Sequence, residues 1–121
     1  MTYANQDIQV GTRVSFSGYT DVYPGTVISR TAKRLVVRED KGELLNGANS
    51  GEPDAMKCYP GGFAAHFEGK QRWDIQEDLD GRTVTFTWRE KAGKWVMKGS
   101  DPKTQGGKLM EGWRKYHDFN F

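Results

Sequence analysis

The sequence has little cysteine, few histidines and no long apolar run. Of its 121 residues, one is a cysteine (Cys58) and two are histidines. A lone cysteine excludes an internal disulfide and a cysteine-based zinc site, and it favours a reducing compartment. No apolar stretch approaches the ~20 residues that a membrane helix needs, and the N-terminus lacks the basic and apolar regions of a signal peptide. We therefore expect a cytoplasmic protein with no metal, no cofactor and no membrane partner.

Catalytic signatures are lacking as well. Neither His66 nor His117 stands in a motif with a nucleophilic serine or cysteine. The glycine-rich segment 98–108 is not a Walker loop, because Lys108 is followed by Leu109 where such a loop needs Ser or Thr. The sequence therefore favours a binding protein over an enzyme.

What the chain does have is strand-like alternation. In the stretch 83–98, Val84, Phe86 and Trp88 alternate with threonines, and Gly93 lies in the turn before a second apolar run. Val14 and Phe16, and Leu35 and Val37, show the same two-residue period. Fifteen glycines fit short strands and tight turns. The sequence predicts an all-β protein, a small SH3-like or Tudor-like barrel of five to six short antiparallel strands in one domain over residues 1–121.

Three segments interrupt or end this pattern. Residues 40–62 contain seven glycines and prolines, which predicts a long irregular loop inserted in the barrel. Residues 18–25 read as a turn-rich loop before a strand that begins at Thr26. Residues 106–121 form an aromatic C-terminal segment, in which 109–116 can make one or two amphipathic helical turns.

Charge is distributed unevenly along the chain. Residues 30–41 carry a net charge of +3, residues 68–80 carry −3, and residues 82–121 carry +5, although the whole chain is only +2. Basic regions on a nearly neutral protein favour a phosphate-bearing partner. The alternative is a solvated surface that keeps the protein soluble.

Rings and cations in loops supply a candidate binding site. A tyrosine ring between glycine and proline can stack on a base, worth about 1–3 kcal/mol, while a neighbouring Arg or Lys holds phosphate. We expect the tyrosines to share one groove with the basic edge of the following strands. The predicted ligand-binding residues are Tyr19, Tyr23, Arg30, Arg34, Lys103 and Lys108.

The aromatic C-terminal segment has two possible uses. A frayed terminus is usually polar, so this one is expected to pack on the barrel. Alternatively it mediates a contact between copies of the chain, because exposed aromatic residues serve well at interfaces. The candidate interface residues are Trp113, Tyr116, Phe119 and Phe121.

Three segments carry a resemblance to known proteins. They are TDVYPGTVISR at 20–30, RTVTFTWREKAGKWVMKGS at 82–100 and GGKLMEGWRKYHDFNF at 106–121. Together they resemble a family of small, mostly uncharacterised proteins of tailed phages. The resemblance implies a phage origin, a compact β fold and a place in the host cytoplasm, and it implies no established activity.

These observations lead to one functional expectation and two alternatives. We expect a non-enzymatic binding protein that recognises nucleic acid or a nucleotide. Given the resemblance, it could counter a host defence by sequestering a nucleotide signal or by blocking a nucleic-acid-dependent complex. The alternatives are an inhibitor that docks on a host enzyme through the acidic edge at 74–80 or the aromatic tail, and a virion accessory or structural protein.

Overall fold

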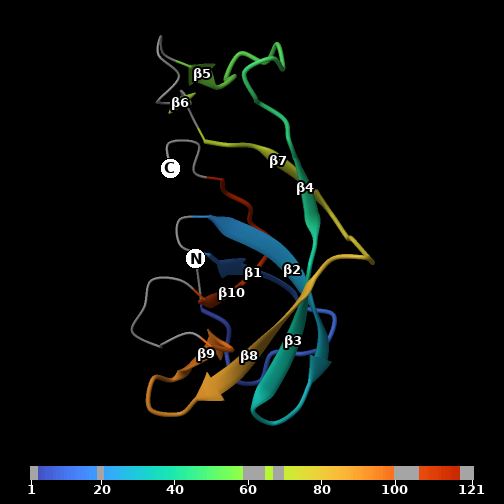
Figure 1. Ribbon diagram of the computed structural model, residues 1–121, viewed down its shortest axis with the longest axis vertical. Coiled ribbons are helices and arrows are strands. Elements are labelled where there is room, and N and C mark those ends of the chain that lie inside the picture. The colour runs from blue at the N-terminus through green and yellow to red at the C-terminus, as the bar shows by residue number, and fades with distance from the viewer. Residues whose placement is uncertain (1–2, 19–20, 59–64, 67–69, 100–106, 118–121) are drawn as a thin grey trace.

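The protein is all-β (Figure 1). The computed structural model describes residues 3–18, 21–58, 65–66, 70–99 and 107–117, and within these it contains strands and no helix. This part of the chain accordingly has no helix of the length and hydropathy needed to cross a membrane. The strands are β1 (Arg13–Ser17), β2 (Val22–Arg30), β3 (Arg34–Glu39), β4 (Lys41–Leu44), β5 (Lys57–Cys58), β6 (Ala65–His66), β7 (Trp73–Gln76), β8 (Thr83–Arg89), β9 (Lys94–Met97) and β10 (Leu109–Glu111).

Six of these strands form a nearly closed antiparallel sheet. Their order is β10-β1-β2-β3-β8-β9. The two outer strands approach each other where Val96 pairs with Lys108 and the Met97 amide donates to the Gly107 carbonyl at 3.1 Å. The predicted small all-β barrel is therefore confirmed, with six strands and an arrangement consistent with an SH3-like barrel.

The barrel core consists of the residues that alternate along the strands. Phe16, Leu35 and Phe86 are completely buried and come from β1, β3 and β8. Val84 and Trp88 pack against this core from the same face of β8 as Phe86, as the alternation predicts. An N-terminal segment that carries the buried Ala4 and Ile8 completes the core. Trp95 fixes this segment, because its Nε1 donates to the Asn5 carbonyl at 2.8 Å.

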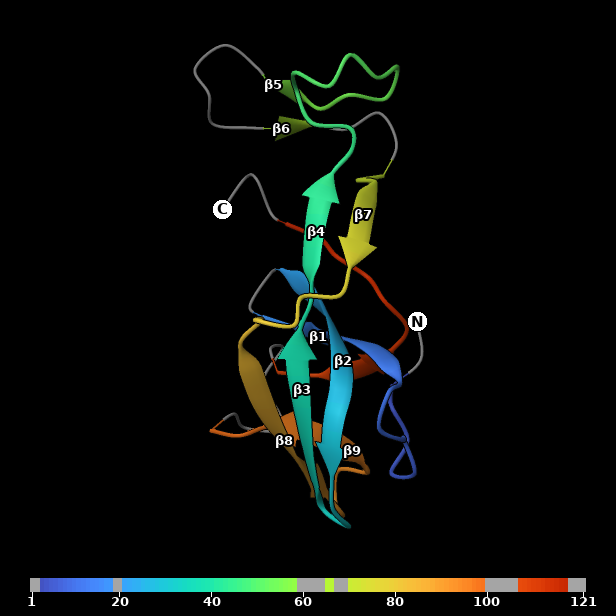
Figure 2. The same ribbon diagram turned by 90° about the vertical axis from the view of Figure 1, so that its right-hand side faces the viewer.

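After β3 the chain forms an arm that projects from the barrel, and it returns from this arm into β8 (Figure 2). We define the arm as residues 41–58, 65–66 and 70–76; in it β4 pairs with β7 and β5 with β6. The predicted irregular loop 40–62 is thus wrong in part, since β4 and β5 lie inside it. Gly42, which suggested a loop, lies within β4, where the Lys115 side chain packs closely against it: a Cβ there would lie 2.5 Å from Lys115 Cδ.

Asp40 fixes the point at which the chain leaves the barrel for the arm. Its carboxylate is buried and accepts hydrogen bonds from Thr26 Oγ1 at 2.6 Å, the Asp78 amide at 3.0 Å and Arg38 Nη2 at 3.2 Å. These donors belong to β2, to the chain that returns from the arm, and to β3. One side chain therefore joins the three segments that meet at the base of the arm.

Strand β2 begins at Val22, four residues earlier than predicted, so Tyr23 lies in a strand and not in a loop. Proline has no N–H to donate to a neighbouring strand. In a strand, the nitrogen and the carbonyl of one residue face the same neighbour, and those of Pro24 face the edge of β2 at which β3 ends, so Pro24 is tolerated there. Its carbonyl accepts from the Asp40 amide at 2.9 Å, the point where β3 ends. Gly25 is required by close packing, since a Cβ there would lie 2.6 Å from Val37 Cγ1.

The C-terminal segment occupies the edge of β2 that β3 leaves free. After β10, residues 112–117, which we call the strap, run beside β2; the Val22 amide donates to the Tyr116 carbonyl at 2.9 Å and the reverse bond is 3.0 Å. The predicted helical turns over 109–116 are wrong. Gly112 has a φ of 90°, a left-handed conformation that excludes a continuous helix, and pairing with β1 and β2 holds the segment extended.

Candidate functional site

Two aromatic rings and two cations gather where the barrel meets the arm. We call Tyr23, Trp73, Arg82 and Lys115 the junction cluster. Lys115 Nζ lies 5.6 Å from the ring centroid of Tyr23 and 5.1 Å from that of Trp73. Arg82 Cζ lies 5.3 Å from the Tyr23 centroid. Arg82 is exposed and the other three are partly exposed, so the cluster is accessible to a ligand.

The cluster sits on the end of the barrel core. Tyr23 is paired across the strands with Phe16, and their ring centroids are 5.5 Å apart. Arg82 immediately precedes β8 and also covers Phe16, with its Cζ 5.8 Å from that ring. The partly exposed ring of Tyr23 therefore packs on the buried ring of Phe16.

The two cations differ in their ion pairing. Arg82 Nε donates to Glu39 Oε1 at 2.6 Å, which leaves its two terminal nitrogens for other acceptors. Lys115 forms no ion pair with any described residue, so its charge is held only by ring faces. Burial, and then the nearby Asp21 carboxylate, raise the pKa of the Tyr23 hydroxyl above its usual value, so this ring is neutral at physiological pH.

A second contact between a ring and a cation joins the strap to β1. Trp113 donates from Nε1 to the Gly25 carbonyl at 2.9 Å, and Arg13 Cζ lies 4.1 Å from its ring centroid. Trp113, a candidate interface residue, thus makes its observed contacts within the chain. Tyr116 is different, because 47% of it remains exposed. Its interface role stays a prediction.

The predicted groove of tyrosines and basic strand residues is wrong. Tyr23 and Arg30 are seven positions apart on β2, roughly 23 Å at 3.3 Å per residue. Arg30 donates to the Gln6 carbonyl in the N-terminal segment, and Arg34 is exposed near the same end of the barrel, since Arg30 pairs with Leu35. The groove required Tyr23 to lie in a loop close to this basic edge, whereas Tyr23 belongs to β2 and lies near the other end of that strand.

Lys108, also predicted to bind a ligand, contacts a ring outside the cluster. Lys108 lies next to Ser17, with its Nζ 5.8 Å from the Tyr3 ring centroid. Four of the predicted ligand and interface residues lie outside the described residues, namely Tyr19, Lys103, Phe119 and Phe121.

Tyr23 is the one member of the junction cluster that the sequence analysis predicted as a ligand-binding residue. Trp73 was not among the predicted ligand-binding residues, and Arg82 and Lys115 entered only through the net charge of residues 82–121. No local signal pairs them, because the cluster exists only through the return of the arm and of the strap to β2. Within the described ranges, no group of His, Cys, Asp or Glu side chains is placed to hold a metal ion.

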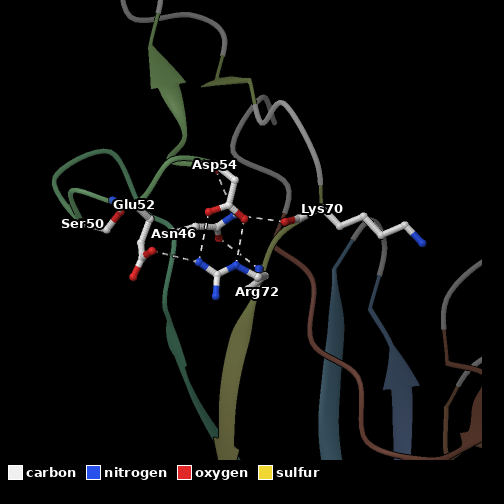
Figure 3. A network of polar contacts seen from close by, with 6 residues as sticks. All are labelled: Asn46, Ser50, Glu52, Asp54, Lys70 and Arg72. Carbon is white, nitrogen blue, oxygen red and sulfur yellow. Dashed lines mark hydrogen bonds and ion pairs between the residues drawn. The ribbon is translucent and has the colours of Figure 1, made fainter.

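A polar network near the end of the arm fixes residues 70–72 (Figure 3). Asn46 is fully buried, and its Nδ2 donates to the carbonyls of Lys70 and Asp54, at 3.0 and 3.1 Å, while its Oδ1 accepts from the Arg72 amide at 3.0 Å. Arg72 in turn binds the Asp54 carboxylate through two bonds of 2.8 and 3.0 Å, and it pairs with Glu52 at 3.5 Å. The result is a loop with a defined shape.

This network also positions the strap. Gln71, between the two residues held by Asn46, donates from Nε2 to the His117 carbonyl at 2.7 Å and accepts from the His117 amide at 3.1 Å. It also accepts from Trp73 Nε1 at 3.1 Å. The arm therefore holds the strap two residues beyond Lys115, which sets where that cation lies.

We expect the network to open in acid. Hydrogen bonds from Arg72 hold the pKa of Asp54 below its ordinary value of 3.8. A carboxyl whose pKa is lowered in the folded state stabilises that state above the unfolded pKa, and the contribution is lost as pH falls through the folded pKa. Protection of the Met56 amide, which donates to the Asn46 carbonyl, should fall between about pH 5 and pH 2 in hydrogen-exchange NMR. Asp54→Asn should remove this pH dependence, and unchanged protection in the wild type would contradict the prediction.

Comparison with protein-family models, with curated proteins and with solved structures gives no match to this chain.

Proposed function

We propose that this protein is a non-enzymatic binding protein that recognises a phosphate-bearing ligand, a nucleic acid or a nucleotide, at the junction cluster. The observation that carries the proposal is the position of Lys115. This cation lies between the rings of Tyr23 and Trp73 and forms no ion pair with the described residues. Arg82 adds a second cation on the Tyr23 ring. Rings beside cations are the common means by which proteins bind bases and phosphates without catalysis.

In the proposed mechanism the aromatic rings bind the base and the cations bind the phosphate. A base stacks on the partly exposed ring of Trp73 or Tyr23, and the phosphate takes charge-assisted hydrogen bonds from Lys115 and from the terminal nitrogens of Arg82. Arg82 can keep its Glu39 bond through Nε while doing so. The cations are already in place, which lowers the entropy cost of binding.

The likeness of three segments to tailed-phage proteins extends the proposal to a biological role. A protein of this kind would act in an infected cell by sequestering a nucleotide signal of the host defence or by blocking a nucleic-acid-dependent complex. Both roles require binding without turnover, which suits a site built from rings and cations.

Fluorescence anisotropy with a labelled oligonucleotide and with a labelled nucleotide tests the proposal. Lys115→Ala should weaken binding by about tenfold to a hundredfold, because one charge-assisted hydrogen bond is lost. The affinity should also fall steeply between about 50 and 200 mM salt. Arg34→Ala is the matched control, since it removes an exposed cation at the opposite end of the barrel and should leave binding unchanged. Absence of binding at low salt, or equal loss in both variants, would refute the proposal.

A further inference from the structure

The strap presents different side chains on its two faces. Trp113 and Lys115 are half-buried against the protein, whereas Arg114 and Tyr116 are exposed. This alternation follows from the extended conformation, in which successive side chains point to opposite faces. The strap therefore has an outer face with its own cation and ring.

The outer face of the strap is not used by the fold. Neither the Arg114 nor the Tyr116 side chain makes a hydrogen bond, an ion pair or a ring contact with the described part of the chain, and 47% of Tyr116 is exposed. The two residues lie about 6.8 Å apart along an extended chain. Residues 112–117 include no carboxylate, so nothing within the strap cancels this charge.

A further cation, Arg13 of β1, lies beside the strap. Arg13 is exposed and stacks on Trp113, two residues before Lys115 on the strap. Cations and rings thus occur on both faces of the strap, with Trp113 and Lys115 on the inner face, Arg114 and Tyr116 on the outer face, and Arg13 against Trp113. A mononucleotide offers one base and adjoining phosphates, which the junction cluster alone can satisfy. It leaves Arg114 and Tyr116 without a function.

We infer that the ligand is a single-stranded nucleic acid that lies along the strap, with one base at the junction cluster and another stacked on Tyr116. This inference rests on the proposed function and narrows it. The strand is single because a base must be unpaired to offer its face to a protein ring. Rings and cations without base-edge donors imply weak sequence preference.

Binding as a function of length tests the inference. The full chain is titrated with thymidine monophosphate and with oligothymidylates of increasing length, at constant low salt. We expect the affinity to rise with length and then level off. Tyr116→Ala should weaken binding of the longer oligonucleotides about tenfold and leave the mononucleotide unaffected, because only the second stacking contact is lost. Tyr116→Phe keeps the ring and should bind as the wild type does.

Each other outcome overturns part of the argument. If the mononucleotide binds as tightly as any oligonucleotide, the inference fails and the proposed function stands. If neither binds, both fail. If Tyr116→Ala leaves oligonucleotide binding intact but converts a dimer to a monomer in light scattering, Tyr116 is a contact between copies of the chain and the inference is wrong. Comparison of Lys115→Ala with Tyr116→Ala separates the two claims. Lys115→Ala should weaken the binding of the mononucleotide and of the oligonucleotides, whereas Tyr116→Ala should weaken only the binding of the oligonucleotides.

Discussion

Trp95→Ala is expected to lower the free energy of unfolding by about 3–5 kcal/mol, a large share of the stability of a domain of this size. Trp95 is 1% exposed and packs edge-on against Trp88, with ring centroids 5.4 Å apart. Its Nε1 also holds the N-terminal segment through the Asn5 carbonyl. The substitution therefore leaves a cavity and releases the segment that carries Ala4 and Ile8. Urea unfolding followed by circular dichroism measures the loss.

Two further substitutions test whether the loss of stability comes from the buried Trp95 ring itself. Trp95→Phe keeps an aromatic ring in the core and loses one hydrogen bond, so it should cost clearly less than the alanine variant. Trp88→Ala should also cost less, because Trp88 is only partly buried and its Nε1 has no partner among the described residues. If Trp88→Ala were the more damaging variant, the assignment of Trp95 to the centre of the core would be wrong.

The facing of the strands could be predicted because it is a local property. The two-residue period of Val84, Phe86 and Trp88 is visible within a few positions, and it places Phe86 in the core whatever the rest of the chain does. The same holds for Leu35 and Val37 in β3. Local alternation thus sufficed for the fold class.

Strand ends and the arm could not be predicted, because distant neighbours decide them. Pro24 and Gly25 signal a turn when read alone, yet the packing of Val37 and the departure of β3 place them inside β2. Gly42 belongs to β4 because it pairs with Ile75 of β7, and Lys115, far along the chain, lies against it. Turn residues in the sequence therefore marked close contacts between segments as well as loops.

The candidate site shows the same division. The ring of Tyr23 was predicted as a binding residue from its own neighbourhood. Trp73 and Lys115 were not, because Lys115 lies against the rings of Tyr23 and Trp73 only after the arm and the strap have returned to the barrel. The prediction of Arg30 and Arg34 as its partners assumed that the tyrosines and the basic strand edge share one groove. Strand β2 runs for nine residues and places Arg30 seven positions from Tyr23, which separates them.

Asp40→Ala is the second change with a large expected effect, about 3–5 kcal/mol of unfolding free energy. The carboxylate and its partner Arg38 are both largely buried, with side chains 0% and 13% exposed. Removing the carboxylate leaves Arg38 in the interior without Asp40 and takes away the acceptor of Thr26 Oγ1 and of the Asp78 amide. Thermal and urea unfolding measure the loss. A variant as stable as the wild type would show that these bonds do not hold the base of the arm.

Asp40→Asn links this site to binding. The amide keeps an oxygen for Thr26 or for the Asp78 amide but loses the charge that faces Arg38, so the variant should fold with a smaller loss of stability. Asp40 joins β2, β3 and the chain that returns from the arm. Loss of the Asp40 charge should therefore loosen the arm relative to the barrel. Trp73 approaches Tyr23 and Lys115 only through that arm. At a temperature where the variant is fully folded, oligonucleotide binding should therefore weaken, whereas unchanged affinity would mean that the barrel and the strap alone form the site.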